Sequence, residues 1–106
     1  MDNFKAVYVI LSQLEKDMDK ERADVDKFGP EALCVSRERW LRYLEMMSDV
    51  GYIKGVRIVE DITGTRNADY RDIRITLKGL EYLQENSIMQ KMYRTVKGIK
   101  EIVPGI

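Results

Sequence analysis

The chain lacks histidine altogether and has one cysteine and two prolines in 106 residues. Without histidine, and with Cys34 as its one thiol, it cannot assemble the usual zinc sites alone, and Ser-His-Asp or Cys-His catalysis is excluded. Glu60 and Asp61 are adjacent in a predicted strand and face opposite sides, so they form no acid–base pair. We therefore expect a protein that is not an enzyme and that uses no metal and no cofactor.

Charge of one sign and long apolar runs are also missing. The 18 basic residues balance 18 acidic ones, so no global field draws the chain to nucleic acid or to a membrane. No apolar run approaches the roughly 20 residues of a transmembrane helix. A lone cysteine forms no intrachain disulfide, which suits a reducing cytoplasm, and we expect Cys34 to be a small buried side chain. The predicted setting is cytoplasmic, without a membrane partner.

Length and pattern predict a single domain over residues 1–106, with a core at about 1–86 and a C-terminal helix at about 87–103. A first helix begins after Asp2 or Asn3. Its apolar stripe, at steps of three and four, comprises Phe4, Val7, Leu11, Leu14 and Met18. We interpret the mixed charge run at residues 19–27 as a solvated helix end and loop, and expect Asp17 to face solvent.

The next elements form a helix-turn-helix pattern. Gly29-Pro30 opens a short helix that ends at Cys34, and Ser36 is a good N-cap for a longer one. The apolar stripe of that longer helix comprises Trp40, Tyr43, Leu44, Met47 and Val50. Gly51 ends the helix in a left-handed conformation. In a helix-turn-helix, the second helix enters the major groove of DNA.

A β-hairpin and a further helix complete the predicted core. β-favouring residues recur over residues 52–59 and 70–75, on either side of a polar loop at residues 61–69. Thr76 then caps a helix whose inner face comprises Leu77, Leu80 and Leu83 or Tyr82. The predicted fold class is α+β, a winged helix-turn-helix with a three-helix core, a β-hairpin wing and additional C-terminal helices.

The predicted C-terminal helix combines an apolar seam with a basic stripe. The seam comprises Met89, Met92, Val96 and Ile99, and the stripe comprises Lys91, Arg94, Lys97 and Lys100. Two uses of the seam remain open: it packs on the first helix, or it pairs with a second copy to form a homodimer. The basic stripe either reaches DNA phosphate or is the solvent face of an ordinary amphipathic helix.

Arginine and lysine gather around the predicted second helix and wing, although the whole chain is neutral. The candidate DNA-binding residues are Ser36, Arg37, Arg39, Arg42, Lys54, Arg57 and Arg66. Arginine can form bidentate contacts to guanine or phosphate, and a wing arginine can enter a minor groove. Against this, Glu38, Glu45 and Asp49 share the helix and repel phosphate, which favours a solvated or protein-binding surface. Leu41 and Met46 are the apolar candidates for a protein contact.

Three segments carry the most distinctive pattern. They are Val50-Gly-Tyr-Ile-Lys-Gly-Val56, Ile75-Thr-Leu-Lys-Gly-Leu-Glu-Tyr-Leu-Gln-Glu-Asn86 and Tyr93-Arg-Thr-Val-Lys-Gly-Ile-Lys100. Together they resemble the YjcQ-like family of small bacterial and phage proteins. The resemblance implies a winged-helix-like fold and a phage or prophage setting in a bacterium, and it brings no catalytic site and no defined ligand.

Two hypotheses for function remain. The first is a small phage or prophage-type transcriptional regulator that binds double-stranded DNA through the residues named above. The second is a non-enzymatic protein-interaction module on the same fold, which the neutral charge and the acids around the wing favour.

Overall fold

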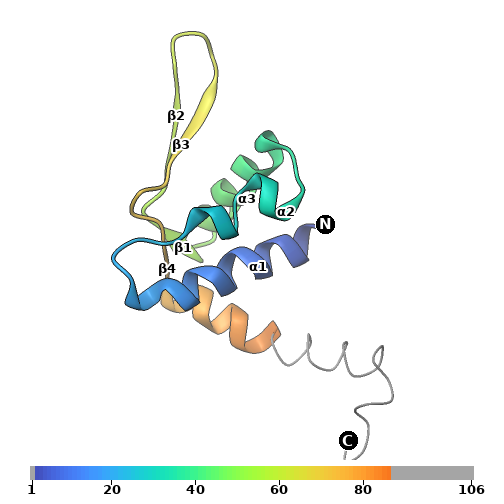
Figure 1. The fold of residues 1–106 in the computed structure, drawn as a ribbon, viewed down its shortest axis with the longest axis vertical. Helices are drawn as coiled ribbons and strands as arrows, with labels where there is room; N and C mark the ends of the chain where they lie inside the picture. The colour runs from blue at the N-terminus through green and yellow to red at the C-terminus, as the bar shows by residue number, and fades with distance from the viewer. Residues whose placement is uncertain (1, 87–106) are drawn as a thin grey trace, which may run out of the picture.

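The computed structural model describes residues 2–86 and places helices and strands in the predicted order (Figure 1). The helices are α1 (Asn3–Lys16), α2 (Pro30–Leu33), α3 (Arg37–Asp49) and a helical segment at residues 77–86, with two 3-10 turns, η1 (Asp17–Asp19) and η2 (Val25–Lys27), between α1 and α2. The α+β class is confirmed, and the arrangement is compatible with a winged-helix-like fold. The helix predicted at about 87–103, with its seam of Met89, Met92, Val96 and Ile99, lies outside the described residues.

Two short antiparallel ladders form one interrupted hairpin after α3. The inner ladder pairs β1 (Ile53–Lys54) with β4 (Arg74–Ile75), and the outer ladder pairs β2 (Arg57–Glu60) with β3 (Arg66–Asp69). We call β2, β3 and the turn between them the wing, which projects from the helices as a long hairpin (Figure 1). The polar loop predicted at residues 61–69 is too long, because β3 takes its last four residues into the ladder. Backbone pairing needs no apolar side chains where a ladder is partly or fully exposed.

Local signals in the sequence place the helix ends correctly. Asp2 accepts a hydrogen bond from the backbone amide of Lys5 at 2.9 Å, and the Ser36 hydroxyl accepts one from the amide of Arg39 at 3.1 Å. Gly51 follows α3 with φ +87°, the left-handed conformation that glycine adopts without steric cost. These three predictions are confirmed.

The hydrophobic core lies between α1 and α3 and is closed by the inner ladder, in which β1 packs on α3 and β4 on α1. Trp40 is 4% exposed, and its indole N–H donates to the backbone oxygen of Phe28 at 2.9 Å. This bond ties α3 to the segment that precedes α2. The other buried apolar residues are Ala6, Ile10, Leu11, Leu14, Phe28, Leu33, Leu41, Tyr43, Leu44, Met47, Ile53, Ile73, Ile75 and Leu83.

The prediction that the apolar stripe of the first helix is buried at both of its ends is wrong. Phe4 and Met18 are 78% and 58% exposed, because α1 turns Ala6, Ile10 and Leu14 toward the core. A periodic pattern identifies the helix, but its phase is set by what the helix packs against.

Cys34 and Leu77 also lie outside the core, contrary to expectation. Cys34 is exposed because it ends α2 in a left-handed conformation, with φ 55°, while the neighbouring Leu33 takes the inward position. Leu77 is 74% exposed, since Leu83 and Gly79 form the buried side of the segment 77–86.

Gly79 sets how closely the segment 77–86 approaches the inner ladder. A Cβ at this position would lie 2.4 Å from the backbone oxygen of Tyr52 and 2.6 Å from Cγ1 of Ile75. The Thr76 hydroxyl accepts from the amide of Gly79 at 3.1 Å, as its predicted cap role requires, and donates to the backbone oxygen of Gly51. The close approach to Tyr52 and Ile75 therefore explains why residue 79 is glycine, although glycine has a low helix propensity.

Asp17 is the one buried charged residue in the described part of the chain, and its predicted exposure is wrong. Its carboxylate accepts from the backbone amide of Asp24 at 2.7 Å and from the Gln13 amide at 3.1 Å, and it pairs with Lys20 at 3.2 Å. The amide of Asp24, followed by Gln13 and Lys20, holds the pKa of Asp17 below its ordinary value despite burial. Two residues of the charge run after α1, Lys20 and Asp24, therefore contact the Asp17 carboxylate.

We expect Gly79→Ala to lower the free energy of unfolding by about 1–3 kcal/mol, the usual cost of overpacking, although alanine is the better helix former by about 1 kcal/mol. Urea unfolding followed by circular dichroism measures it. Lys78→Ala, an exposed neighbour, is the control and should change it by less than about 0.5 kcal/mol. A stabilised Gly79→Ala protein would contradict the close contact.

We expect Asp17→Ala to lower the free energy of unfolding by about 1–3 kcal/mol at neutral pH, because the partly buried donors of Gln13 and Asp24 lose a charged acceptor. Since the folded pKa lies below the ordinary 3.8, this contribution is complete at neutral pH and is lost as the pH falls through the lowered pKa. The difference from wild type, measured by urea unfolding at neutral pH and near pH 3, should therefore shrink in acid. The exposed Asp19→Ala is the control, and an unchanged difference at both pH values would contradict the role of Asp17.

Candidate nucleic-acid interface

α3 is the scaffold of the candidate site. Its inward side comprises Trp40, Leu41, Tyr43, Leu44 and Met47. The prediction that Leu41 lies at the surface is wrong, because its side chain is 1% exposed and lies under the wing. Met46 is 53% exposed, as expected. The remaining positions leave α3 with one flank toward the wing, one flank toward α1 and an outer face between them.

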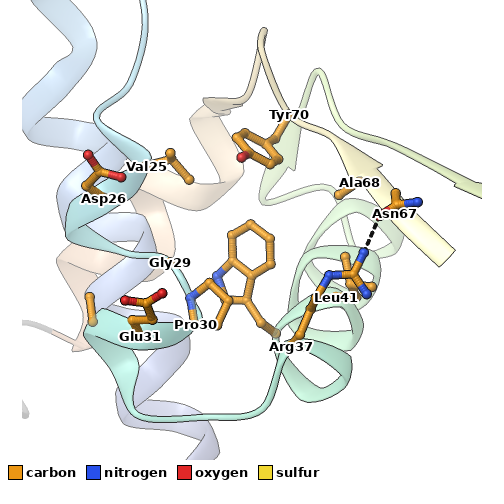
Figure 2. A pocket seen from close by; sticks show the side chains of 12 residues that line it. Val25, Asp26, Gly29, Pro30, Glu31, Arg37, Leu41, Asn67, Ala68 and Tyr70 are labelled. Atoms are coloured by element: carbon orange, nitrogen blue, oxygen red, sulfur yellow. Dashed lines mark hydrogen bonds between the residues drawn. The ribbon is translucent and has the colours of Figure 1, made fainter. Parts of the chain in front are cut away.

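Arg37 joins the first turn of α3 to the wing. Its Nη2 donates to the side-chain oxygen of Asn67 (Figure 2). It also donates to the backbone oxygen of Arg66 at 2.6 Å. In the opposite direction, Nη2 of Arg66 donates to Oε2 of Glu45 at 2.9 Å. We call these contacts of Arg37, Arg66, Asn67 and Glu45 the wing clamp. It makes α3 and the wing a single surface.

Arg39 lies on the opposite flank, beside the start of α1. Its Nη1 donates to Oδ1 of Asn3 at 2.8 Å, and the hydroxyl of Tyr43 donates to the same oxygen at 2.6 Å. One amide oxygen thus orients the guanidinium, whose other donors remain available. Arg39 is exposed, so these donors face solvent.

Arg42 occupies the outer face between these flanks. It is exposed and makes no hydrogen bond or ion pair with any described residue. On a helix that turns about 100° per residue, Arg39 and Arg42 lie about 60° apart, whereas Arg37 lies about 140° from Arg42. The structure therefore brings Arg39 and Arg42 to a shared face and turns Arg37 toward the wing.

The other two predicted basic residues lie outside α3. Arg57, in β2, is 77% exposed at its side chain and makes a weak 3.5 Å contact with Asp69. Lys54 is exposed in the inner ladder, directly opposite Arg74. Neither touches the wing clamp, so both extend the candidate surface without completing a compact site.

Acidic groups limit how basic this surface is. Glu38 lies one turn before Arg42, and Asp49 lies at the end of α3. Glu45 is already compensated by Arg66. The net charge of the outer face is therefore small, and a few arginines must account for any attraction to phosphate.

The turn of the wing is held by Asp61. Its Oδ1 accepts from the backbone amides of Thr63 and Thr65 at 2.8 and 3.0 Å and from the Thr63 hydroxyl. The Thr63 hydroxyl, then the two amides, lowers the pKa of Asp61, which stays ionised at neutral pH. Ile62 beside it is fully exposed. Asp61 therefore fixes the shape of the turn, and the exposed side chain of Ile62 lies at its tip.

A cleft of about 500 Å³ separates the wing from α2 and η2. Arg37 and Asn67 lie on its wing side and Asp26 and Glu31 on its helix side (Figure 2). The rings of Trp40 and Tyr70, 5.7 Å apart and edge to face, line its interior. The acidic wall makes the cleft a poor path for a phosphate backbone, which leaves the outer face of α3 and the wing.

Sequence reasoning missed the two asparagines that orient the arginines. Asn3 and Asn67 are 36 and 30 positions from the arginines they contact. Asparagine is common in turns and at helix starts, so neither position carried a signal of such a role.

These features define a small α+β protein with a short helix, a capped helix and a wing clamped to it. The chain belongs to the YjcQ protein family, whose model matches residues 8–102. No curated protein and no solved structure gives a significant match. Within residues 2–86, no helix has the length and apolar character to cross a membrane. In the same part of the chain, no three or more carboxylate or thiol side chains are grouped to hold a metal ion.

We expect Arg37→Ala to loosen the wing, because α3 then loses its hydrogen bonds to the backbone oxygen of Arg66 and the side-chain oxygen of Asn67 in β3. A clamp contribution of about 1 kcal/mol corresponds to roughly fivefold faster hydrogen exchange of the β2 and β3 amides. Mass spectrometry of deuterium uptake measures this change. Arg57→Ala, which removes a similar charge from the wing without touching the clamp, is the control. Equal exchange in the two variants would contradict the clamp.

Proposed function

We propose that the chain is a winged helix-turn-helix protein that binds double-stranded DNA, a small transcriptional regulator of phage or prophage type. The wing clamp is the observation that carries this proposal, because it holds the wing beside α3 at Arg37 and Glu45. In winged helix-turn-helix proteins the second helix reads the major groove. Family membership supports the small phage-type setting and leaves the ligand open.

The proposal divides the predicted arginines by role. Arg39 and Arg42 face outward and would contact base edges or phosphates along the major groove. Ser36 places the amide end of α3 beside them through its cap. Arg37 and Arg66 already bind protein groups, so they would position the wing and contact DNA less directly. Arg57 and Lys54 would add peripheral phosphate contacts.

The small net charge sets the expected affinity pattern. Few phosphate contacts give a shallow salt dependence, with a slope of roughly −0.9 per phosphate neutralised. Glu38 and Asp49 weaken non-specific attachment along any duplex. Specific binding would then rely on base contacts of the outer face, and non-specific binding would be weak.

The charge reversal Arg39→Glu with Arg42→Glu tests the proposal. Fluorescence anisotropy of a labelled mixed-sequence duplex, titrated at low and at physiological salt, should show at least about tenfold weaker binding at low salt. Lys16→Glu together with Lys5→Glu carries the same charge change on α1 and should weaken binding far less. Equal losses in both double variants would show that only net charge matters and would contradict the assigned face.

A protein-interaction module remains the second candidate, and the exposed Ile62 at the tip of the wing favours it. A protruding isoleucine gains by entering a pocket on a partner. No binding to duplex DNA at low salt would make this the leading function. Its probe is Ile62→Asp, because Leu41 is buried and its replacement would disturb the core.

A further inference from the structure

An apolar groove of about 300 Å³ lies on the opposite flank of α3 from the wing. α1 contributes Phe4 and Val7 to it, and α3 contributes Met46 and Val50. Tyr52 and Tyr82, with rings 4.9 Å apart, close one end. Apart from Asn3 and the tyrosine hydroxyls, the lining is apolar.

The groove is lined by large apolar side chains that are exposed to water. Phe4, Met46 and Val50 are 78%, 53% and 49% exposed, three of the seven large hydrophobic residues exposed among residues 2–86. An apolar patch formed by two helices and an aromatic pair is typical of an interaction surface. Covering it would remove all three side chains from water.

The chain itself supplies a matching segment. Tyr82 lies in the helical segment 77–86, and residues 87–106 follow directly from it. In the sequence, Tyr82, Met89, Val96 and Val103 are seven residues apart, and Met92, Ile99 and Ile106 repeat at the same interval. Seven-residue repeats of apolar residues at two positions are the pattern by which one helix packs against another. The seam therefore continues the seven-residue spacing that begins at Tyr82, which lines the groove.

Charge also matches the segment to the rest of the chain. Residues 87–106 carry four basic and one acidic residue, a net charge of +3, which leaves −3 on residues 1–86. Asp2, Asp49 and Glu81 are exposed and precede Asn3, Val50 and Tyr82 of the groove in the sequence, whereas Arg39 binds Asn3. The net charge of the segment is therefore complementary to that of the rest of the chain.

The segment's sequence favours a second copy over its own groove. To reach its own groove, the chain would have to reverse soon after Asn86. Residues 87–97 contain neither glycine nor proline, the residues that most often allow such a reversal. We therefore favour the groove of a second copy as the binding site of this segment.

We propose that two copies of this chain form a reciprocal dimer, in which residues 87–103 of each copy lay the seam of Met89, Met92, Val96 and Ile99 in the groove of the other. The interface is isologous, so the groove of one copy and the seam of its partner are used twice. The proposal does not depend on DNA binding, because the residues that line the groove are not among the arginines assigned to DNA.

Sedimentation equilibrium of the full chain tests this dimer. Wild type should be dimeric, whereas Val96→Asp with Ile99→Asp, and separately Met46→Asp with Val50→Asp, should weaken the dimer at least roughly 100-fold. Both groove positions are half exposed, so the monomers should fold, which circular dichroism checks. Ile62→Asp with Leu77→Asp, which changes exposed apolar residues outside the groove, is the matched control and should stay dimeric. A monomeric wild type, or a groove variant that stays dimeric, would overturn the proposal.

Cross-linking separates the remaining arrangements. With Cys34→Ser in both, a chain carrying Met46→Cys is mixed with a size-tagged chain carrying Met92→Cys, and a short bismaleimide is added. Covalent heterodimers are expected, because the groove of one chain meets the seam of the other. Cross-links only between two Met92→Cys chains would indicate seam-to-seam pairing, and no heterodimer would indicate docking within one chain. Either result would overturn the reciprocal dimer.

Discussion

The wing clamp is the contact on which the candidate site depends. A two-stranded hairpin is at best marginally stable by itself, and the wing projects far from the core. Arg37 reaches from α3 to the wing backbone, and Arg66 reaches back to Glu45. Both bonds hold β3, and β2 is paired to β3, so the wing cannot shift along α3 without breaking them. The clamp thus turns two elements into one surface of defined shape.

That arrangement gives the arginines unequal roles. In the sequence Arg37, Arg39 and Arg42 look equivalent, but each meets a different neighbour in the structure. Arg37 bonds to the wing, Arg39 is oriented by Asn3, and Arg42 makes no hydrogen bond or ion pair in the described part of the chain. A surface with few free cations and nearby acids is suited to selective contacts, and poorly suited to holding any polyanion.

The sequence predicts those features of the fold that local chemistry decides. The caps of Ser36 and Thr76 and the helix end at Gly51 follow from hydrogen bonding and backbone freedom within a few residues. Residues whose role depends on distant partners could not be found this way. Asp17 reads as one more solvent-facing residue of the first helix, and the clash that makes Gly79 necessary involves Tyr52, which lies far away in the sequence.

The two flanks of α3 explain how one short helix can serve two purposes. Arg37 and Glu45 face the wing, whereas Met46 and Val50 face the apolar groove beside α1. The wing flank and the groove are separate surfaces, and Arg39, which binds Asn3 of the groove, is the DNA-binding candidate nearest to the second one. A reciprocal dimer through the groove would leave both outer faces free and related by two-fold symmetry. Such symmetry is what a protein needs to read the two halves of a palindromic DNA site.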